Sequence, residues 1–176
     1  DLTEKSKVAL LGVLFLVCLA LAYFENILFF NSLDIVFATL WITVPVVFLH
    51  NVFAVSLIML GMAFYVRFVL TFLPQKRFEY VVLQHPRLFA FIFTIVILAV
   101  SILRANTLLR AQLLQNPMLI ILLSLPQGIL EAYAILLAIE KVLKRSLTLK
   151  NIATVYSIFL LAAILEVSFI HFLLHI

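Results

Sequence analysis

Long apolar runs recur along this sequence, and the charged side chains are concentrated in the short segments between them. Hydrophobic residues make up 66% of the chain and charged residues 11%, whereas soluble domains are about half apolar and a quarter charged. A water-soluble fold of 176 residues could not bury this much apolar surface. Lipid accepts such a surface when each segment satisfies its own backbone hydrogen bonds, as an α-helix does. The sequence therefore predicts an integral membrane protein.

Apolar runs of roughly 17–25 residues are long enough to cross the hydrocarbon core as helices. The predicted fold class is all-α, a polytopic transmembrane helix bundle that forms one domain over residues 1–176. The first run lacks a small-residue cleavage site and is followed by further runs, so we expect a first span rather than a removable signal peptide. Five spans are predicted, at 8–24, 51–73, 88–103, 118–139 and 152–175.

The segment 27–49 is harder to place, because its apolar part is short, contains Pro45 and continues into the next run without a loop. If this part does not cross the membrane, nine Lys and Arg residues lie on one side and two on the other; if it crosses, the split is four against seven. An excess of Lys and Arg marks the cytoplasmic side. We therefore predict five spans in the cell membrane, a re-entrant or interfacial helix at 27–49, a cytoplasmic N-terminus and an external C-terminus. The nine are Lys5, Lys7, Lys76, Arg77, Arg87, Lys141, Lys144, Arg145 and Lys150, and the two are Arg104 and Arg110.

Three charged residues fall inside the predicted spans, where a charge costs about 2.5–3.5 kcal/mol on insertion scales. At the rise of an α-helix, Arg67 lies about 9 Å and Glu131 about 12 Å from the cytoplasmic ends of their spans. These similar depths predict an ion pair between Arg67 and Glu131. Glu166 lies about 21 Å from the cytoplasmic end of the last span, so it needs another partner or a neutral form.

Pro126, Gln127 and Gly128 are predicted to interrupt the fourth span near its centre. Proline removes one N–H donor from the helix, and glycine relaxes the backbone after it. Gln127 and Glu131 are four residues apart, so they share one helix face. A discontinuous helix with polar groups near the midplane is typical of a transport site. The alternative is a kinked helix whose polar face, together with Asn51, holds the bundle together.

The histidines are weak candidates for a metal site. His171 and His175 are four residues apart, and His50 lies on the same predicted side. Histidines at a membrane interface explain this pattern better, so no metal is predicted. The sequence also contains no recognisable nucleophile–base arrangement, phosphate-binding loop or haem motif. We expect no enzymatic activity and no cofactor, and the dispersed basic residues predict no nucleic-acid surface.

Three motifs resemble those of the stage II sporulation protein M family. The sequence PQGILE at 126–131 resembles its Pro-His-Gly-x-x-Glu motif, and LAAILE at 161–166 resembles its Ala-Ala-x-x-Glu motif. His50 and Asn51, followed by Gly61, resemble its Asn-Asn start and the glycine of an earlier span. The resemblance runs from about residue 46 to the end. This chain departs from the pattern at Gln127, where the family has His, and at His50, and it lacks the Asn-Gly motif, so it resembles a divergent member.

The resemblance implies a multi-spanning protein of the plasma membrane that works with partner proteins, as the name-giving member does in peptidoglycan remodelling. We therefore expect a scaffold or partner subunit of a membrane complex. Its partners would be the lipid bilayer and other membrane proteins or a second copy of the chain. The alternative is a transporter or channel for ions or small solutes that uses the interrupted helix at Pro126–Gly128 with Glu131 and Glu166.

Overall fold

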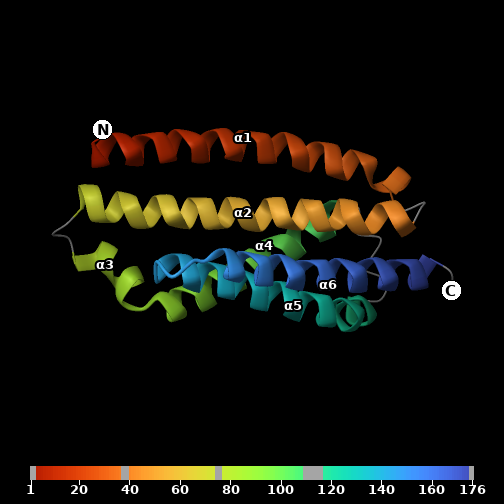
Figure 1. The fold of residues 1–176 in the computed structure, drawn as a ribbon. Helices are drawn as coiled ribbons and strands as arrows, with labels where there is room; N and C mark the ends of the chain where they lie inside the picture. The colour runs from red at the N-terminus through yellow and green to blue at the C-terminus, as the bar shows by residue number, and fades with distance from the viewer. Residues whose placement is uncertain (1–2, 37–39, 74–76, 109–116, 175–176) are drawn as a thin grey trace.

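The computed structural model describes residues 3–36, 40–73, 77–108 and 117–174, and the regular elements in these ranges are all α-helices (Figure 1). The all-α prediction is confirmed for this part of the chain. The helices are α1 Glu4–Val36, α2 Leu40–Phe72, α3 Arg77–Gln84, α4 Pro86–Leu108, α5 Pro117–Leu143 and α6 Leu149–Leu174.

Three helical stretches among the described residues are long and apolar enough to cross a membrane. A shorter apolar stretch occupies the first part of α4. Large apolar side chains are exposed along the outer faces of these helices, which suits contact with lipid tails. These features agree with a protein of the membrane. The three stretches are Glu4–Phe29, Ile42–Phe72 and Leu149–Phe169, and the shorter one is Pro86–Ala99.

The long helices lie side by side and alternate in direction (Figure 1). α1 packs on α2, α2 also packs on α5 and α6, and α5 packs on both α4 and α6. The N-terminus, α3 and the turn between α5 and α6 lie at one end of the bundle. The end of α1, the start of α2 and the end of α6 lie at the opposite end. One end of the molecule therefore holds the start of α1 with its lysines, the basic start of α4 and the basic turn between α5 and α6.

The prediction of a separate re-entrant or interfacial helix at 27–49 is wrong. Residues 27–36 form the last part of α1, and residues 40–49 form the first part of α2. Pro45 lies in the second turn of α2, where its missing N–H costs a single hydrogen bond to the carbonyl of Trp41. Such a loss is tolerated in a membrane helix when the adjoining turns and neighbouring helices hold the backbone. The segment is therefore divided between the two arms of a helical hairpin.

The two arms of the hairpin approach closely at a pair of glycines. A Cβ atom on Gly12 would lie 2.9 Å from the ring of Phe64, and one on Gly61 would lie 2.9 Å from the ring of Phe15. Each phenylalanine of one helix thus covers the glycine of the other. The two rings are stacked, with centroids 6.1 Å apart and planes at 15°. This reciprocal contact fixes the register of α1 against α2.

Alanine provides the close packing in the other half of the bundle. Ala134 and Ala138 on α5 and Ala162 and Ala163 on α6 are all 0% exposed. Small residues at this spacing allow two membrane helices to approach closely. The sequence analysis predicts helices but did not single out these alanines. Ala134 and Ala138 belong to a core that includes Val155 and extends to α2 and α4, whereas Ala163 packs in a second cluster with Val47 and Val167.

A short turn connects α5 to α6 at the basic end of the bundle. Arg145 has a φ of 54°, and the N–H groups of Arg145 and Ser146 donate to the carbonyls of Val142 and Lys141. This is the Schellman arrangement that closes a helix C-terminus. Thr148 then accepts a hydrogen bond from the N–H of Asn151 at 3.3 Å and caps α6. The turn fixes α5 and α6 as antiparallel neighbours.

Candidate functional site

Glu131 of α5 and Glu166 of α6 lie on the faces of these helices that are buried in the bundle. Glu131 precedes the fully buried Ala134 and Ala138 by three and seven residues, so it lies on their face of α5. Glu166 lies three and four residues after Ala163 and Ala162 on α6. Both carboxyl side chains are half-buried. The helical repeat therefore directs the two glutamates towards the interior of the bundle.

Asn51 of α2 joins this cluster by a direct contact. Its Nδ2 donates a hydrogen bond to Oε1 of Glu131 at 3.3 Å. Glu166 lies on the buried face of α6, which packs on both α2 and α5. We call the polar residues on these inward faces the carboxyl cluster: Asn51, Gln127, Glu131 and Glu166. Among the described side chains, the cluster has no basic partner within ion-pair distance.

The predicted ion pair between Arg67 and Glu131 is wrong. Arg67 is exposed, and none of the ion pairs among the described residues includes it. Its charge instead reaches Glu4 at the start of α1. A hydrogen bond from Lys7 holds the pKa of Glu4 below its usual range, and Arg67 adds a smaller effect in the same direction. Arg67 therefore lies near the basic end of the bundle.

The depth estimate failed because the helices do not end at the same level. Arg67 lies five residues, about 8 Å, from the end of α2 at Phe72. Glu131 lies twelve residues, about 18 Å, from the end of α5 at Leu143. The sequence estimate ended α5 at residue 139 and took both helices to end at one level. Because α5 continues for one more turn, to Leu143, Glu131 lies further from the end of its helix than Arg67 does from the end of α2. This difference separates the two side chains along the bundle.

The predicted interruption of the fourth span is also wrong, because α5 remains helical from Pro117 to Leu143 with Pro126 inside it. Pro126 still removes the N–H donor for one carbonyl in the preceding turn. Gln127 is half-buried, and its Oε1 atom is buried without a hydrogen-bond partner among the described residues. A Cβ atom on Gly128 would meet nothing within 4 Å. α5 is therefore not unwound at this position. The Oε1 atom of Gln127, within the carboxyl cluster, accepts no hydrogen bond from the described residues.

The histidines do not form a metal site in the described part of the chain. No group of three or more His, Cys, Asp or Glu side chains is close enough there to hold an ion. His50 instead contacts Glu25 of α1, with Nδ1 2.9 Å and 3.2 Å from the two carboxyl oxygens. Phe29 stacks on the imidazole at a centroid distance of 4.0 Å. His171 is exposed, and His175 lies outside the described residues.

Sequence reasoning missed two contacts between helices. Glu25 lies eleven residues before the end of α1 and His50 ten residues after the start of α2, so a continuous hairpin would have placed them nearly opposite one another. The interpretation of 27–49 as a separate helix concealed this symmetry. The second contact is a hydrogen bond between the hydroxyls of Ser56 and Tyr156 at 2.7 Å, which joins α2 to α6. No sequence signal indicates that pair, because it depends on the register of two helices far apart in the chain.

No family model, no curated protein and no solved structure matches this chain.

Proposed function

We propose that this chain is a multi-pass protein of the cell membrane, in which α1, α2, α4, α5 and α6 all cross. Its N-terminus would be cytoplasmic and its C-terminus external. The support is the gathering of the N-terminus, α3 and the α5–α6 turn at one end, because cytoplasmic connections carry the excess of Lys and Arg (Figure 1). Even α4, with 23 residues, reaches about 35 Å and exceeds the hydrocarbon thickness of about 30 Å.

Within this bundle, we propose that the carboxyl cluster binds a proton or a small cation. The observation that carries the proposal is that Glu131 and Glu166 lie on the buried faces of neighbouring helices without a basic partner among the described residues. Two carboxylate charges repel one another, and lipid raises the cost of each. A shared proton or cation removes both costs. Ionisable groups that face a bundle interior commonly mark proton or ion pathways.

The other atoms of the cluster suit the same ligand class. Gln127 offers a buried carbonyl oxygen that accepts no hydrogen bond from the described residues, and Pro126 leaves one carbonyl of α5 without its N–H donor. Carboxylate, amide and backbone oxygens are hard ligands, which prefer hard cations to soft transition metals. Proton-coupled or cation-coupled transport is therefore the first proposed function.

A membrane scaffold is the second proposed function. Two interhelical hydrogen bonds favour it, because Asn51 joins α2 to α5 and Ser56 joins α2 to α6. In this proposal the polar residues hold the bundle together while its outer surface binds partner proteins. The resemblance to the stage II sporulation protein M family adds to the scaffold proposal, because it implies work with partners. The family assignment itself stays a proposal.

Flux measurements in liposomes separate the two functions. The full chain is reconstituted, and proton or Na⁺ movement down an imposed gradient is recorded for the wild type and for Glu131→Gln and Glu166→Gln. Transport predicts a wild-type flux that falls at least tenfold in either variant, because each loses a titratable ligand. Glu140→Gln is the matched control, since Glu140 lies on the same helix but pairs with Lys144 at its end.

The stability of each variant is measured in parallel by thermal unfolding in detergent. A folded wild type without flux would contradict the transport proposal and leave the scaffold as the function. Equal loss of flux in Glu140→Gln would likewise contradict the role of the carboxyl cluster.

A further inference from the structure

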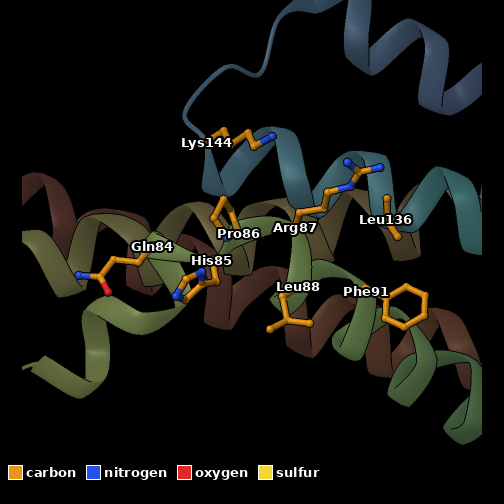
Figure 2. A pocket seen from close by; sticks show the side chains of 8 residues that line it. All are labelled: Gln84, His85, Pro86, Arg87, Leu88, Phe91, Leu136 and Lys144. Carbon is orange, nitrogen blue, oxygen red and sulfur yellow. The ribbon is translucent and has the colours of Figure 1, made fainter.

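A hollow at the basic end of the bundle lies outside the carboxyl cluster. It forms where α3 meets α4, against the last turns of α5, and has a volume of about 630 Å³ (Figure 2). Its position matches the cytoplasmic membrane boundary of the proposed orientation, on which the present inference rests. Eight residues line the hollow: Gln84, His85, Pro86, Arg87, Leu88, Phe91, Leu136 and Lys144.

The lining of the hollow is divided between polar and apolar side chains. Arg87 extends from the first turn of α4 towards α5, and Lys144 lies near Pro86 at the end of α5 (Figure 2). Leu88 and Phe91 lie further along α4 and are 59% and 53% exposed. Leu136 completes the apolar side from α5. The basic groups of Lys144 and Arg87 therefore lie along the α5 side of the hollow, and Leu88 and Phe91 form apolar surface on its α4 side (Figure 2).

Of the two basic residues that line the hollow, Arg87 is the one without an ion pair among the described side chains. Lys144 donates a hydrogen bond to Glu140, which holds the pKa of Glu140 below its usual range. Arg87 lowers that pKa further from a longer distance, so the carboxylate remains charged and partly neutralises Lys144. An added anion would therefore contact Arg87 first and share Lys144 with Glu140.

The start of α4 adds a second attraction for an anion. Pro86 is the first residue of α4, and the N–H of Phe89 already donates to the carbonyl of His85. The N–H groups of Arg87 and Leu88 in the first turn have no partner within the helix. Together with the helix dipole, such groups favour a phosphate at a helix N-terminus. Arg87 and Leu88 both line the hollow.

We propose that this hollow binds an anionic glycerophospholipid, with its phosphate on Arg87 and Lys144 and an acyl chain along Leu88, Phe91 and Leu136. The commitment to a lipid follows from the divided lining. A free phosphate would contact only the basic groups, whereas a phospholipid of the surrounding bilayer can place its phosphate on the basic groups and an acyl chain along the apolar side of the same hollow. Basic pockets between helices on the cytoplasmic side are established sites for acidic lipid headgroups.

Native mass spectrometry of the full chain in a neutral detergent tests the proposal. Phosphatidylglycerol and phosphatidylcholine with identical acyl chains are added separately, and inorganic phosphate is added as a competitor. We expect phosphatidylglycerol to bind more tightly and phosphate not to displace it at millimolar concentration. Arg87→Gln should weaken phosphatidylglycerol binding roughly fivefold or more, since one basic group near a lipid surface contributes about that factor.

Two further variants serve as controls for the position and the charge of Arg87. Lys150→Gln removes an exposed charge at the same end without touching the hollow, and should leave the affinity unchanged. Arg87→Lys keeps the charge, so it should lose less affinity than Arg87→Gln. Equal binding of the two lipids, equal affinity of Arg87→Gln and the wild type, or displacement by phosphate would overturn the proposal. The readout is independent of flux, so failure here leaves the function of the carboxyl cluster unaffected.

Discussion

Asn51 and Glu131 lie on facing helices, and the amide of Asn51 donates a hydrogen bond to the carboxyl group at 3.3 Å. This contact replaces the arginine partner expected from the sequence. Arg67 extends into the region of Glu4 instead, where a long side chain can keep its charged group near the membrane surface. Glu131 is thus held by a neutral donor rather than by an ion pair.

A double-mutant cycle tests the contact between Asn51 and Glu131. Asn51→Leu should lower the free energy of unfolding by about 1–3 kcal/mol, because Glu131 loses its hydrogen-bond donor in a half-buried site. Adding Glu131→Leu should recover much of this loss. Arg67→Met, at an exposed position, should change stability by less than about 0.5 kcal/mol. Unfolding in detergent measures all of these effects. Additive losses at Asn51 and Glu131, or a large effect at Arg67, would show that the contact is assigned incorrectly.

At the level of helices, the three glycines have different surroundings although all of them are helical. Gly12 and Gly61 lie under the rings of Phe64 and Phe15, where an added methyl group would come within 2.9 Å of a ring atom. Gly128 has open space around its Cα. The glycine after Pro126 therefore has no packing role in the described bundle, whereas the other two allow α1 and α2 to approach.

The same substitution should therefore have different effects at two of these positions. Gly128→Ala should raise the free energy of unfolding by about 0.5–1 kcal/mol, because alanine is the better helix former and meets no atom. Gly61→Ala should gain less than Gly128→Ala or lose stability, because the ring of Phe15 must move away. Thermal unfolding of the two variants side by side makes the comparison. A larger gain at Gly61 than at Gly128 would contradict the described packing of α1 on α2.

At the scale of the whole molecule, α1 and α2 are longer than a bilayer requires. Each has 33 residues and extends about 50 Å, against a hydrocarbon thickness of about 30 Å. Glu25 lies 21 residues, about 31 Å, from Glu4, so the pair of Glu25 with His50 falls near the external boundary when Glu4 lies at the cytoplasmic one. The tip of the hairpin then extends beyond the membrane in the proposed orientation.

Cysteine labelling tests this orientation. With Cys18 replaced by alanine, single cysteines are introduced as Ser146→Cys, Asn31→Cys and Gln112→Cys and exposed to a membrane-impermeant thiol reagent on intact cells. We expect labelling of Asn31→Cys and Gln112→Cys from outside, and of Ser146→Cys only after the membrane is opened. The reason is the gathering of basic connections on the cytoplasmic side. External labelling of Ser146→Cys would contradict the proposed topology.

The sequence by itself determined the helical class and the membrane character, because both follow from local properties. An apolar run of sufficient length forms a helix in lipid whatever its neighbours are, and loop charge biases orientation without knowledge of packing. The same reasoning placed Gln127 and Glu131 on one face of α5, since the helical repeat is also local. It misplaced the ends of α5 and the segment 27–49. Whether a helix continues through a proline, and where it ends, depend on contacts with the neighbouring turns.

Only the tertiary structure decided which polar side chains meet. The contacts of Asn51 with Glu131 and of Ser56 with Tyr156 join residues that are 80 and 100 positions apart in the sequence. They depend on the relative height and rotation of whole helices, which buried alanines and the α5–α6 turn set through packing. A shift of one helical turn, about 5.4 Å, would exchange every such partner. The helices were therefore predictable from the sequence, and the carboxyl cluster and the hollow at Arg87 were not.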